Sequence, residues 1–209
     1  MGRINEYDRQ NGRRRKRNPI IYIICEGTET EPRYFKAFRT RFCKIDIIPL
    51  SSAYKSADSL VKKVKSTLGE NPYYPDEGDV VWCVFDCDDN TNDMLLRAKQ
   101  LSEKLGYRIA FSNPCFEYWY LLHFCEYKAY LENCNAVLNQ LRKKGRIENY
   151  QKSGDVYQLL LGLQDIAIKN AKGRLKSLIN DKTEFMTRES NPATNVSELV
   201  GYLNSKRNE

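Results

Sequence analysis

The stretch DVVWCVFDCDDN, residues 79–90, decides how the fold is interpreted. Residues 80–85 form a near-continuous apolar and β-branched run that is too short to span a membrane. Because the run is apolar on both faces, it predicts a central, buried strand of a parallel sheet. The run ends at Asp86, Asp88 and Asp89, which places carboxylates at the C-terminal edge of the sheet. Open α/β folds bind their ligands at this edge, so the stretch predicts a ligand site as well as a strand.

Asp86 and Asp88 are candidate ligands of one metal ion. On an extended chain, side chains two residues apart share a face, so the two carboxylates can converge. Mg²⁺ is the expected ion, because proteins hold it with one or two carboxylates together with water and substrate phosphate. The alternative is a polar strand-to-helix turn in which Asp89 or Asn90 caps the next helix. The residues of this stretch leave both interpretations open.

A second buried strand is predicted at residues 19–25, PIIYIIC, and it also runs directly into an acid, Glu26. Gly27 follows and lets the chain turn sharply off the sheet. Pro32 prefers the first helical position and disfavours a helical residue before it, which places Glu31 at the helix cap. Glu26 then either binds backbone N–H groups of this turn or faces the aspartates from a neighbouring strand. In the second case three carboxylates meet, and they cannot all be ionised there without a cation.

Strand and helix patterns alternate four times up to residue 111. Short strands are predicted at residues 44–50 and 107–111, and helical periodicity marks residues 56–68 and 94–105. This alternation predicts an α/β fold with a four-stranded, mostly parallel sheet that is flanked by helices and joined by right-handed crossovers.

Beyond Phe111 the sequence predicts helices only. Asn113 and Pro114 predict a helix cap and a first helical residue, leading into the apolar segment CFEYWYLLHF, which should be buried. Glu117 lies in the first turn of this helix, at the same sheet edge as the other acids. It is either a further site residue or a carboxylate that only complements the helix dipole.

Three helices with basic polar faces are predicted in the last third of the chain, at residues 136–144, 156–163 and 166–179. Such charge is usually a solvated face, although Tyr150 and Tyr157 beside it could stack on bases. Residues 191–195, NPATN, predict a turn. Asn195 with Glu198 resembles a capping box that opens a last helix.

The composition is that of an ordinary globular protein, with 209 residues, 41% hydrophobic and 29% charged. We expect a basic flexible arm at residues 1–18, an α/β core at 19–125 and a helical extension at 126–209 packed on the core. No secretory segment and no membrane span is apparent, so we expect a cytoplasmic protein. The seven cysteines are odd in number and form no C-x-x-C pair, which favours reduced packing residues over disulfides or zinc ligands.

The net charge of +7 is concentrated at the N-terminus. Residues 1–18 carry seven basic side chains against two acidic ones, which leaves the rest of the chain nearly neutral. The basic run within this arm could contact nucleic acid through its phosphates without reading sequence, or it could be a solvated terminus that only aids solubility. We favour nucleic-acid contact by the run Arg13, Arg14, Arg15, Lys16 and Arg17.

Several catalytic classes find no support in the sequence. It contains no P-loop, no G-x-S-x-G motif and a single histidine, His123. His123 lies one turn past Trp119 and is expected to be a packed, hydrogen-bonded helix residue and not a general base. The acids that follow the two buried strands are therefore the leading candidates for chemistry.

Several short motifs resemble the RloB-like family. They are Glu26-Gly27 after the first strand, T-E-x-x-Y-F at residues 30–35, F-D-x-D at 85–88, S-N-P-x-F-E-x-W at 112–119, L-L-H-F, and N-P-A-T-N-V near the end. Each motif is short, but their order and spacing are fairly specific, and together they extend from Ile20 to about Leu203.

This resemblance implies a fold and a function. The family looks like a member of the Toprim superfamily, which implies a Toprim-like Rossmannoid core and a Mg²⁺ or Mn²⁺ ion held by Glu26, Asp86 and Asp88. It also implies a role in phage defence through abortive infection, beside restriction-modification loci and often with an ATPase subunit. The expected partners are a nucleic acid, DNA or RNA, and that ATPase subunit, while self-association is left open.

The leading hypothesis is a metal-dependent nuclease. Glu26, Asp86 and Asp88 would hold one or two ions, with Glu31 or Glu117 in support, and the metal would activate water and stabilise charge on a phosphodiester. A nearby lysine or arginine would assist. One alternative is a non-catalytic subunit that binds nucleic acid or an ATPase on a Toprim-like scaffold. A second is a receiver-like or phosphatase α/β domain in which one aspartate accepts a phosphoryl group.

Overall fold

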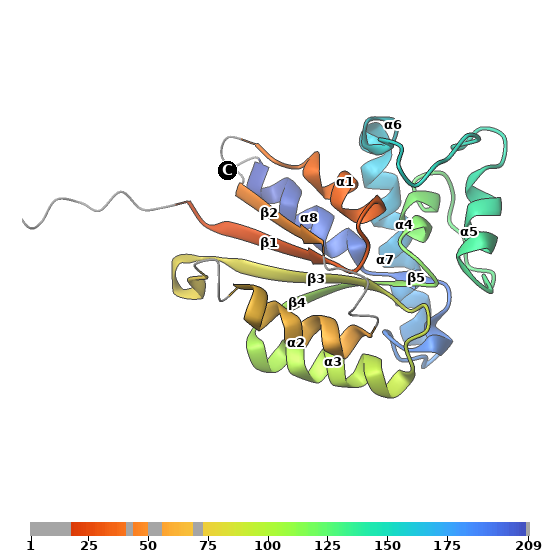
Figure 1. The fold of residues 1–209 in the computed structure, drawn as a ribbon. Helices are drawn as coiled ribbons and strands as arrows, with labels where there is room; N and C mark the ends of the chain where they lie inside the picture. Colours follow the sequence, from red (N-terminus) through yellow and green to blue (C-terminus); the bar gives the residue numbers. More distant parts are fainter. Residues whose placement is uncertain (1–17, 41–43, 50–55, 69–72, 208–209) are drawn as a thin grey trace, which may run out of the picture.

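The computed structural model describes residues 18–40, 44–49, 56–68 and 73–207. Its centre is a five-stranded sheet in the order β2-β1-β3-β4-β5 (Figure 1). The strands are β1 (Ile20–Cys25), β2 (Lys44–Pro49), β3 (Val80–Asp86), β4 (Arg108–Asn113) and β5 (Ala193–Thr194). All pairings are parallel except that of β4 with β5. The predicted α/β fold with a mostly parallel sheet is confirmed, with one strand more than expected.

Eight α-helices surround this sheet in the described residues. They are α1 (Thr30–Lys36), α2 (Ala57–Leu68), α3 (Asn92–Leu105), α4 (Glu117–Leu121), α5 (Cys134–Leu141), α6 (Tyr157–Leu160), α7 (Gln164–Asn180) and α8 (Val196–Arg207). Three short 3₁₀ helices, η2 (Pro75–Glu77), η3 (Leu161–Leu163) and η4 (Arg188–Ser190), complete the elements. The helices predicted from periodicity are therefore present, with ends that differ by a few residues.

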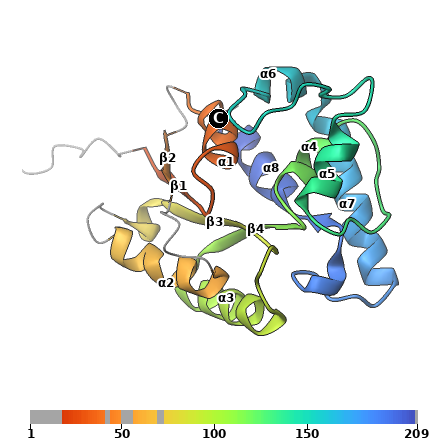
Figure 2. The same ribbon diagram turned by 45° about the vertical axis from the view of Figure 1, so that its right-hand side comes forward.

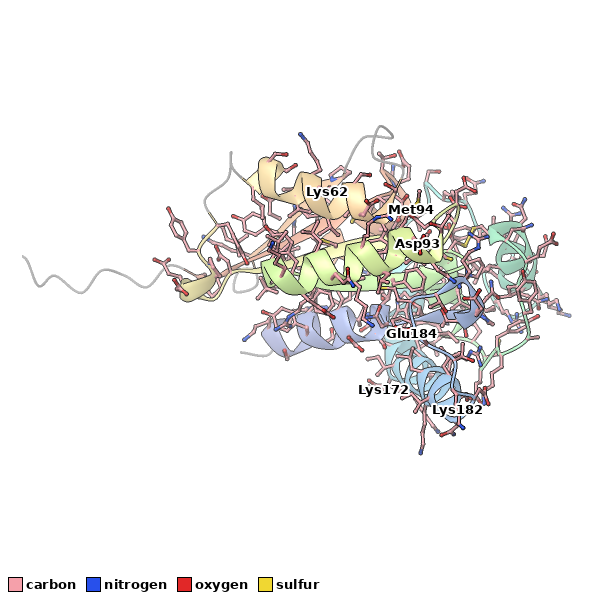
Figure 3. The ribbon with its side chains drawn as sticks, turned by 90° about the horizontal axis from the view of Figure 1, so that it is seen from below. Lys62, Asp93, Met94, Lys172, Lys182 and Glu184 are labelled. Atoms are coloured by element: carbon pink, nitrogen blue, oxygen red, sulfur yellow. A yellow bond between two sulfur atoms is a disulfide. The ribbon has the colours of Figure 1, made fainter. Side chains whose placement is uncertain are left out.

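The sheet separates two apolar cores, because alternate residues of each buried strand point to opposite faces. Tyr22 and Ile24 of β1 pack with α2 and α3 on one face. Figure 3 views this side, with Lys62 on α2 and with Asp93 and Met94 on α3. Ile21 and Ile23 face the other core, which includes side chains of α1, α4, α5, α6, α7 and α8.

The chain reverses its direction of strand addition between β1 and β3. From β1 it moves outward to β2 and then returns to the other side of β1, so β1 and β3 are neighbours. The helix that follows β1 packs on one face, and the helix that follows β3 packs on the opposite face (Figure 1). The two connections thus diverge at the carboxyl ends of these strands and leave a crevice, which is where open α/β sheets bind ligands.

The C-terminal part of the chain is not purely helical, contrary to expectation. The predicted turn at residues 191–195 contains β5, which pairs antiparallel with the end of β4 through Ser112 and Asn113. Asn195 directly precedes α8, and its Nδ2 donates a 3.4 Å hydrogen bond to Oε2 of Glu198. Its Oδ1, however, does not cap the helix, because it accepts a 2.7 Å hydrogen bond from the backbone N–H of Phe111. A two-residue strand has no periodicity of its own, so only its partner defines it.

Three helix starts differ from the prediction. The helix expected at Pro114 begins at Glu117, because Asn113 still belongs to β4. The first helix begins at Thr30, so Glu31 lies inside it. Thr91 caps α3, while Asn90 instead accepts a 2.8 Å hydrogen bond from the backbone N–H of Ala57, the first residue of α2. Asn90 therefore joins two elements that are distant in sequence.

The expectation that the cysteines are all reduced is wrong for one pair. Cys115 and Cys134 form a disulfide, whereas Cys25, Cys83, Cys87 and Cys125 are free. Cys115 and Cys134 are 19 residues apart, a spacing that does not indicate a disulfide pair in the sequence. The two cysteines meet because α4, which begins two residues after Cys115, packs against α5, which begins with Cys134 (Figure 2).

The candidate base-stacking tyrosines lie in the core. Tyr150 and Tyr157 are 3% and 2% exposed, so their rings cannot stack on a nucleic acid. His123 is buried as expected, its Nδ1 lies 2.9 Å from the carbonyl oxygen of Trp119, and burial lowers its pKa to about 4. The apolar segment that surrounds it is also buried, which confirms the prediction for α4.

Two expectations concern other parts of the chain. The basic run from Arg13 to Arg17 lies outside the described residues, so its contact with nucleic acid stays a prediction. In the described part of the chain, no helix has the length and apolar character needed to cross a bilayer.

Candidate metal centre

A hollow of about 290 Å³ lies in the crevice at the carboxyl ends of β1 and β3. Among the described residues, six acidic side chains and one basic side chain border it, an excess of negative charge that favours a cation. The bordering residues are Glu26, Gly27, Thr28, Glu29, Thr30, Glu31, Asp86, Asp88, Phe116, Glu117 and Lys152. All five acids predicted as site residues are in this set, so the structure brings them to one place.

Glu26 joins the ends of the two central strands. Its backbone N–H donates a 3.0 Å hydrogen bond to the carbonyl of Val84, which extends the parallel pairing of β1 and β3 by one residue. Its Oε2 accepts a 3.2 Å hydrogen bond from the backbone N–H of Asp86. Burial and the nearby carboxylates of Glu31 and Asp88 raise the pKa of Glu26 to about 7. Glu26 therefore faces Asp86, as expected for neighbouring strands.

Asp86 has a carboxylate oxygen without a partner in the hollow. Its Oδ1 is buried and has no hydrogen-bond partner. Burial, followed by the charges of Glu31, Glu117 and Glu26, raises its pKa well above the usual value of an aspartate. A buried acceptor without a partner costs about 1–3 kcal/mol, and more when the group is charged. A cation at this oxygen would remove that cost.

Glu31 lies against the backbone of the turn that follows β1. It is 6% exposed, and burial together with the charge of Glu117 raises its pKa. A Cβ atom at Gly27 would lie 2.8 Å from Oε1 of Glu31, closer than a carbon and an oxygen can approach without displacement. Gly27 has no positive φ among the described backbone angles. A methyl group at this position would therefore displace the Glu31 carboxylate, which is the movable end of a flexible side chain.

Glu117 is buried and held by hydroxyl groups. Its Oε1 accepts a 2.9 Å hydrogen bond from Tyr150 and a 3.5 Å hydrogen bond from Thr30. Its Oε2 lies 3.4 Å from Sγ of Cys134. Because Glu117 is 3% exposed, the alternative in which it only complements a helix dipole from solvent does not apply.

Asp88 reaches the hollow in a different way from that predicted. β3 ends at Asp86, and Asp88 has a φ of 29°, so the two aspartates do not lie on one extended segment. Arg188, which is distant in sequence, stabilises this turn. Its Nη1 donates hydrogen bonds of 3.1 Å to the carbonyl of Asp88 and 2.9 Å to that of Asn90. Asp88 is exposed and forms the outer wall of the hollow.

The donor set fits a hard divalent cation. No ion pair among the described residues involves Glu26, Glu31, Asp86, Asp88 or Glu117. The carboxylates stand apart, since the set of three ligand-type side chains found within 4.8 Å of one another in the described chain is Cys115, Glu117 and Cys134. Like charges repel one another, so the acids would have to close on an ion when it binds. Carboxylate oxygens are donors that suit Mg²⁺ or Mn²⁺, so the chemistry of this donor set fits either ion.

Sequence reasoning missed three residues at this site. Tyr150 carries the hydrogen bond to Glu117, Lys152 is the one basic residue bordering the hollow, and Arg188 holds the turn after β3. Tyr150 and Lys152 lie in the irregular segment between α5 and α6, where no hydrophobic periodicity predicts which side chains point toward the hollow. Arg188 is about a hundred residues from the turn that it holds. A tertiary structure was needed to find all three.

Comparison with known proteins gives one match. A family model described as RloB-like protein matches residues 21–203, a range that begins within β1, ends within α8 and includes all five candidate acids of the hollow. Neither the curated proteins nor the solved structures give a match to the chain.

Proposed function

The chain belongs to the RloB-like protein family, and from that premise we propose that it is a Mg²⁺- or Mn²⁺-dependent nuclease of the Toprim type. Its substrate would be a phosphodiester of DNA or RNA. We further propose that it is an effector of phage defence by abortive infection, that it works in the cytoplasm, and that it acts together with an ATPase subunit.

One observation carries the proposal. Oδ1 of Asp86 is buried without a partner in a hollow bordered by five further acids, and no described cation forms an ion pair with the five candidate ligands. Folding concentrates negative charge there against desolvation and mutual repulsion, as the raised pKa values of Glu26, Glu31 and Asp86 indicate. Strongly perturbed acids in a cleft are typical of functional sites.

The residues divide into ligands and supports. Glu26 and Asp86 would hold the ion, with Asp88 on the open side and with Glu31 and Glu117 from the buried side. When bound, the ion would supply Lewis acidity and lower the pKa of a water molecule. Lys152 is exposed at the rim, so its ammonium group can bind a phosphate oxygen and orient the phosphodiester. Tyr150 and Thr30 fix the orientation of Glu117 through their hydroxyl groups.

The test combines metal binding with cleavage. The purified chain should bind Mn²⁺ in calorimetric titration and cut at least one member of a panel of single- and double-stranded DNA and RNA. Glu26→Gln and Asp86→Asn should abolish both activities while the thermal unfolding transition is kept. Glu29→Gln is the matched control, because Glu29 borders the same hollow but is half-exposed and paired with Arg33 at 2.8 Å.

One result would count against the assigned site, and another against a nuclease. Cleavage that persists in Asp86→Asn would exclude the assigned site. Mn²⁺ binding without cleavage of any substrate, with or without the ATPase subunit, would favour the non-catalytic binding subunit.

A further inference from the structure

We propose that the disulfide between Cys115 and Cys134 is a redox control of the acidic hollow, which binds its cation well in the disulfide form and poorly in the dithiol form. This inference rests on the proposed function, because the property under control is the affinity of the hollow for Mg²⁺ or Mn²⁺. It adds a regulatory input that the acids themselves do not provide.

The disulfide lies directly beside one of the candidate ligands. Cys115 is two residues before Glu117, and Cys134 is the first residue of α5. Sγ of Cys134 lies 3.4 Å from Oε2 of Glu117, whereas Oε1 of the same carboxylate is bound by Tyr150. The oxygen that remains available for a cation is thus the one next to the disulfide.

The bridge also holds the backbone that carries Glu117. Glu117 opens α4, a helix of only five residues, and the disulfide ties the residues just before it to α5. Side chains that support a metal ligand usually change metal affinity about 10–100-fold when they are altered. We therefore expect reduction to act on the cation without changing any ligand chemically.

A small reductant can reach the bridge. Cys134 is partly exposed and borders a second hollow of about 490 Å³, whose wall also includes Asp88 and the exposed Tyr130. Asp88 borders both this second hollow and the acidic one. Cys134 is thus the more accessible of the two cysteines, because Cys115 is only 5% exposed.

The chemistry is ordinary thiol–disulfide exchange with a dithiol as the reductant. A thiolate of the reductant attacks Sγ of Cys134, the bond between the two cysteine sulfurs breaks, and Cys115 leaves as a thiolate that takes up a proton. The second thiol of the reductant then closes its own disulfide and releases Cys134. The protein gains two electrons and two protons in total, and the reductant loses them.

Reduction places a new hydrogen-bond donor beside Glu117. A disulfide sulfur carries no hydrogen, whereas the thiol of Cys134 can donate one to Oε2 of Glu117. The freed thiol then competes with a cation for this oxygen, and α5 is no longer tied to the turn that precedes α4. Disulfides in the cytoplasm, where we propose that the protein acts, are usually transient and redox-sensing.

The decisive experiment uses the wild-type chain in two forms. One sample is kept oxidised, and the other is reduced with dithiothreitol and desalted without oxygen. Alkylation followed by peptide mass analysis should label Cys115 and Cys134 only after reduction. Calorimetric titration with Mn²⁺ should then give an affinity about 10-fold weaker for the reduced form. Thermal unfolding of both forms verifies that each is folded.

Two variants complete the test. The double variant Cys115→Ser with Cys134→Ser should bind Mn²⁺ equally before and after reduction. Cys125→Ser is the matched control, because Cys125 is a free, partly exposed cysteine with no contact to the acids, and it should keep the wild-type response.

The outcomes separate the two proposals. Equal Mn²⁺ affinity of the two wild-type forms would overturn the redox control and leave the nuclease proposal standing. Cysteines that are already alkylated before reduction would also overturn it. Absence of Mn²⁺ binding in both forms would overturn the proposed function, and the redox control with it.

Discussion

Tyr150 donates a 2.9 Å hydrogen bond to Oε1 of Glu117, although the two residues are 33 positions apart in the chain. Both side chains are buried, so the hydroxyl group sets the direction of the carboxylate. The hydrogen bond also links the irregular segment after α5 to the first turn of α4. A candidate ligand is thus oriented by a residue that has no ligand chemistry of its own.

Tyr150→Phe should weaken Mn²⁺ binding about 10-fold, because it leaves Glu117 in place without its main donor. The free energy of unfolding should fall by about 1–3 kcal/mol, since a buried carboxylate loses a hydrogen bond. Calorimetric titration and denaturant unfolding measure the two effects. Tyr157→Phe is the control: Tyr157 is an equally buried tyrosine that accepts a hydrogen bond from Arg207, away from the acids, and its variant should bind Mn²⁺ normally.

Gly27→Ala should reduce Mn²⁺ affinity at least about 10-fold, because the added methyl group would occupy the space of the Glu31 carboxylate. Gly201→Ala in α8 provides the comparison, since a Cβ atom there meets no atom within 4 Å. That control should leave Mn²⁺ binding unchanged and stabilise the helix by about 0.5–1 kcal/mol. If Gly27→Ala bound Mn²⁺ with wild-type affinity, Glu31 would not be a ligand.

Arg188→Met should loosen the turn after β3, because the carbonyls of Asp88 and Asn90 lose their shared donor. We expect Mn²⁺ affinity to fall several-fold and unfolding free energy to fall by about 1 kcal/mol. Lys172→Met removes an exposed positive charge from α7 and controls for net charge (Figure 3). An equal loss of affinity in both variants would indicate a general charge effect instead of a positional one.

The metal-free protein should lose stability as the pH rises from about 4.5 to about 7. The unfolded chain releases the proton of Glu26 near pH 4.5, whereas burial keeps it on the folded protein up to about pH 7. The folded state therefore binds more protons in this window, and its free energy of unfolding falls as the pH increases. Burial also raises the pKa of Asp86, so ionisation of this residue likewise lowers the stability of the metal-free protein as the pH rises.

Melting temperatures across this pH range, measured with a chelator and with Mg²⁺, give the check. The cation binds the ionised acids, so Mg²⁺ should raise the melting temperature at pH 7.5 and have little effect at pH 5. Glu26→Gln should flatten the profile in the chelator. A melting temperature that is constant from pH 5 to pH 7.5 in the chelator would mean that the acids are not held together as described.

The strands and the acids that end them were predictable from local patterns. The apolar runs before Glu26 and Asp86 are typical of central strands in a parallel sheet, and they form β1 and β3 in the middle of the sheet. The glutamate at the start of α4 was placed at the correct sheet edge, although the helix begins three residues later than predicted. The role of Asn90, the partner of the Asn195 side-chain oxygen and the disulfide were not predicted, because each depends on a residue distant in sequence.

The sequence by itself determined which residues form the buried strands and which carboxylates follow them, because hydrophobic periodicity and chain breaks act over a few residues. Only the tertiary structure decided that β1 and β3 are neighbours and that Asp86 has a carboxylate oxygen without a partner. It also decided that Tyr150 contacts one carboxylate oxygen of Glu117 while the disulfide lies beside the other. These are contacts between segments separated by tens of residues. Their geometry follows from strand order and helix packing, which no local pattern specifies.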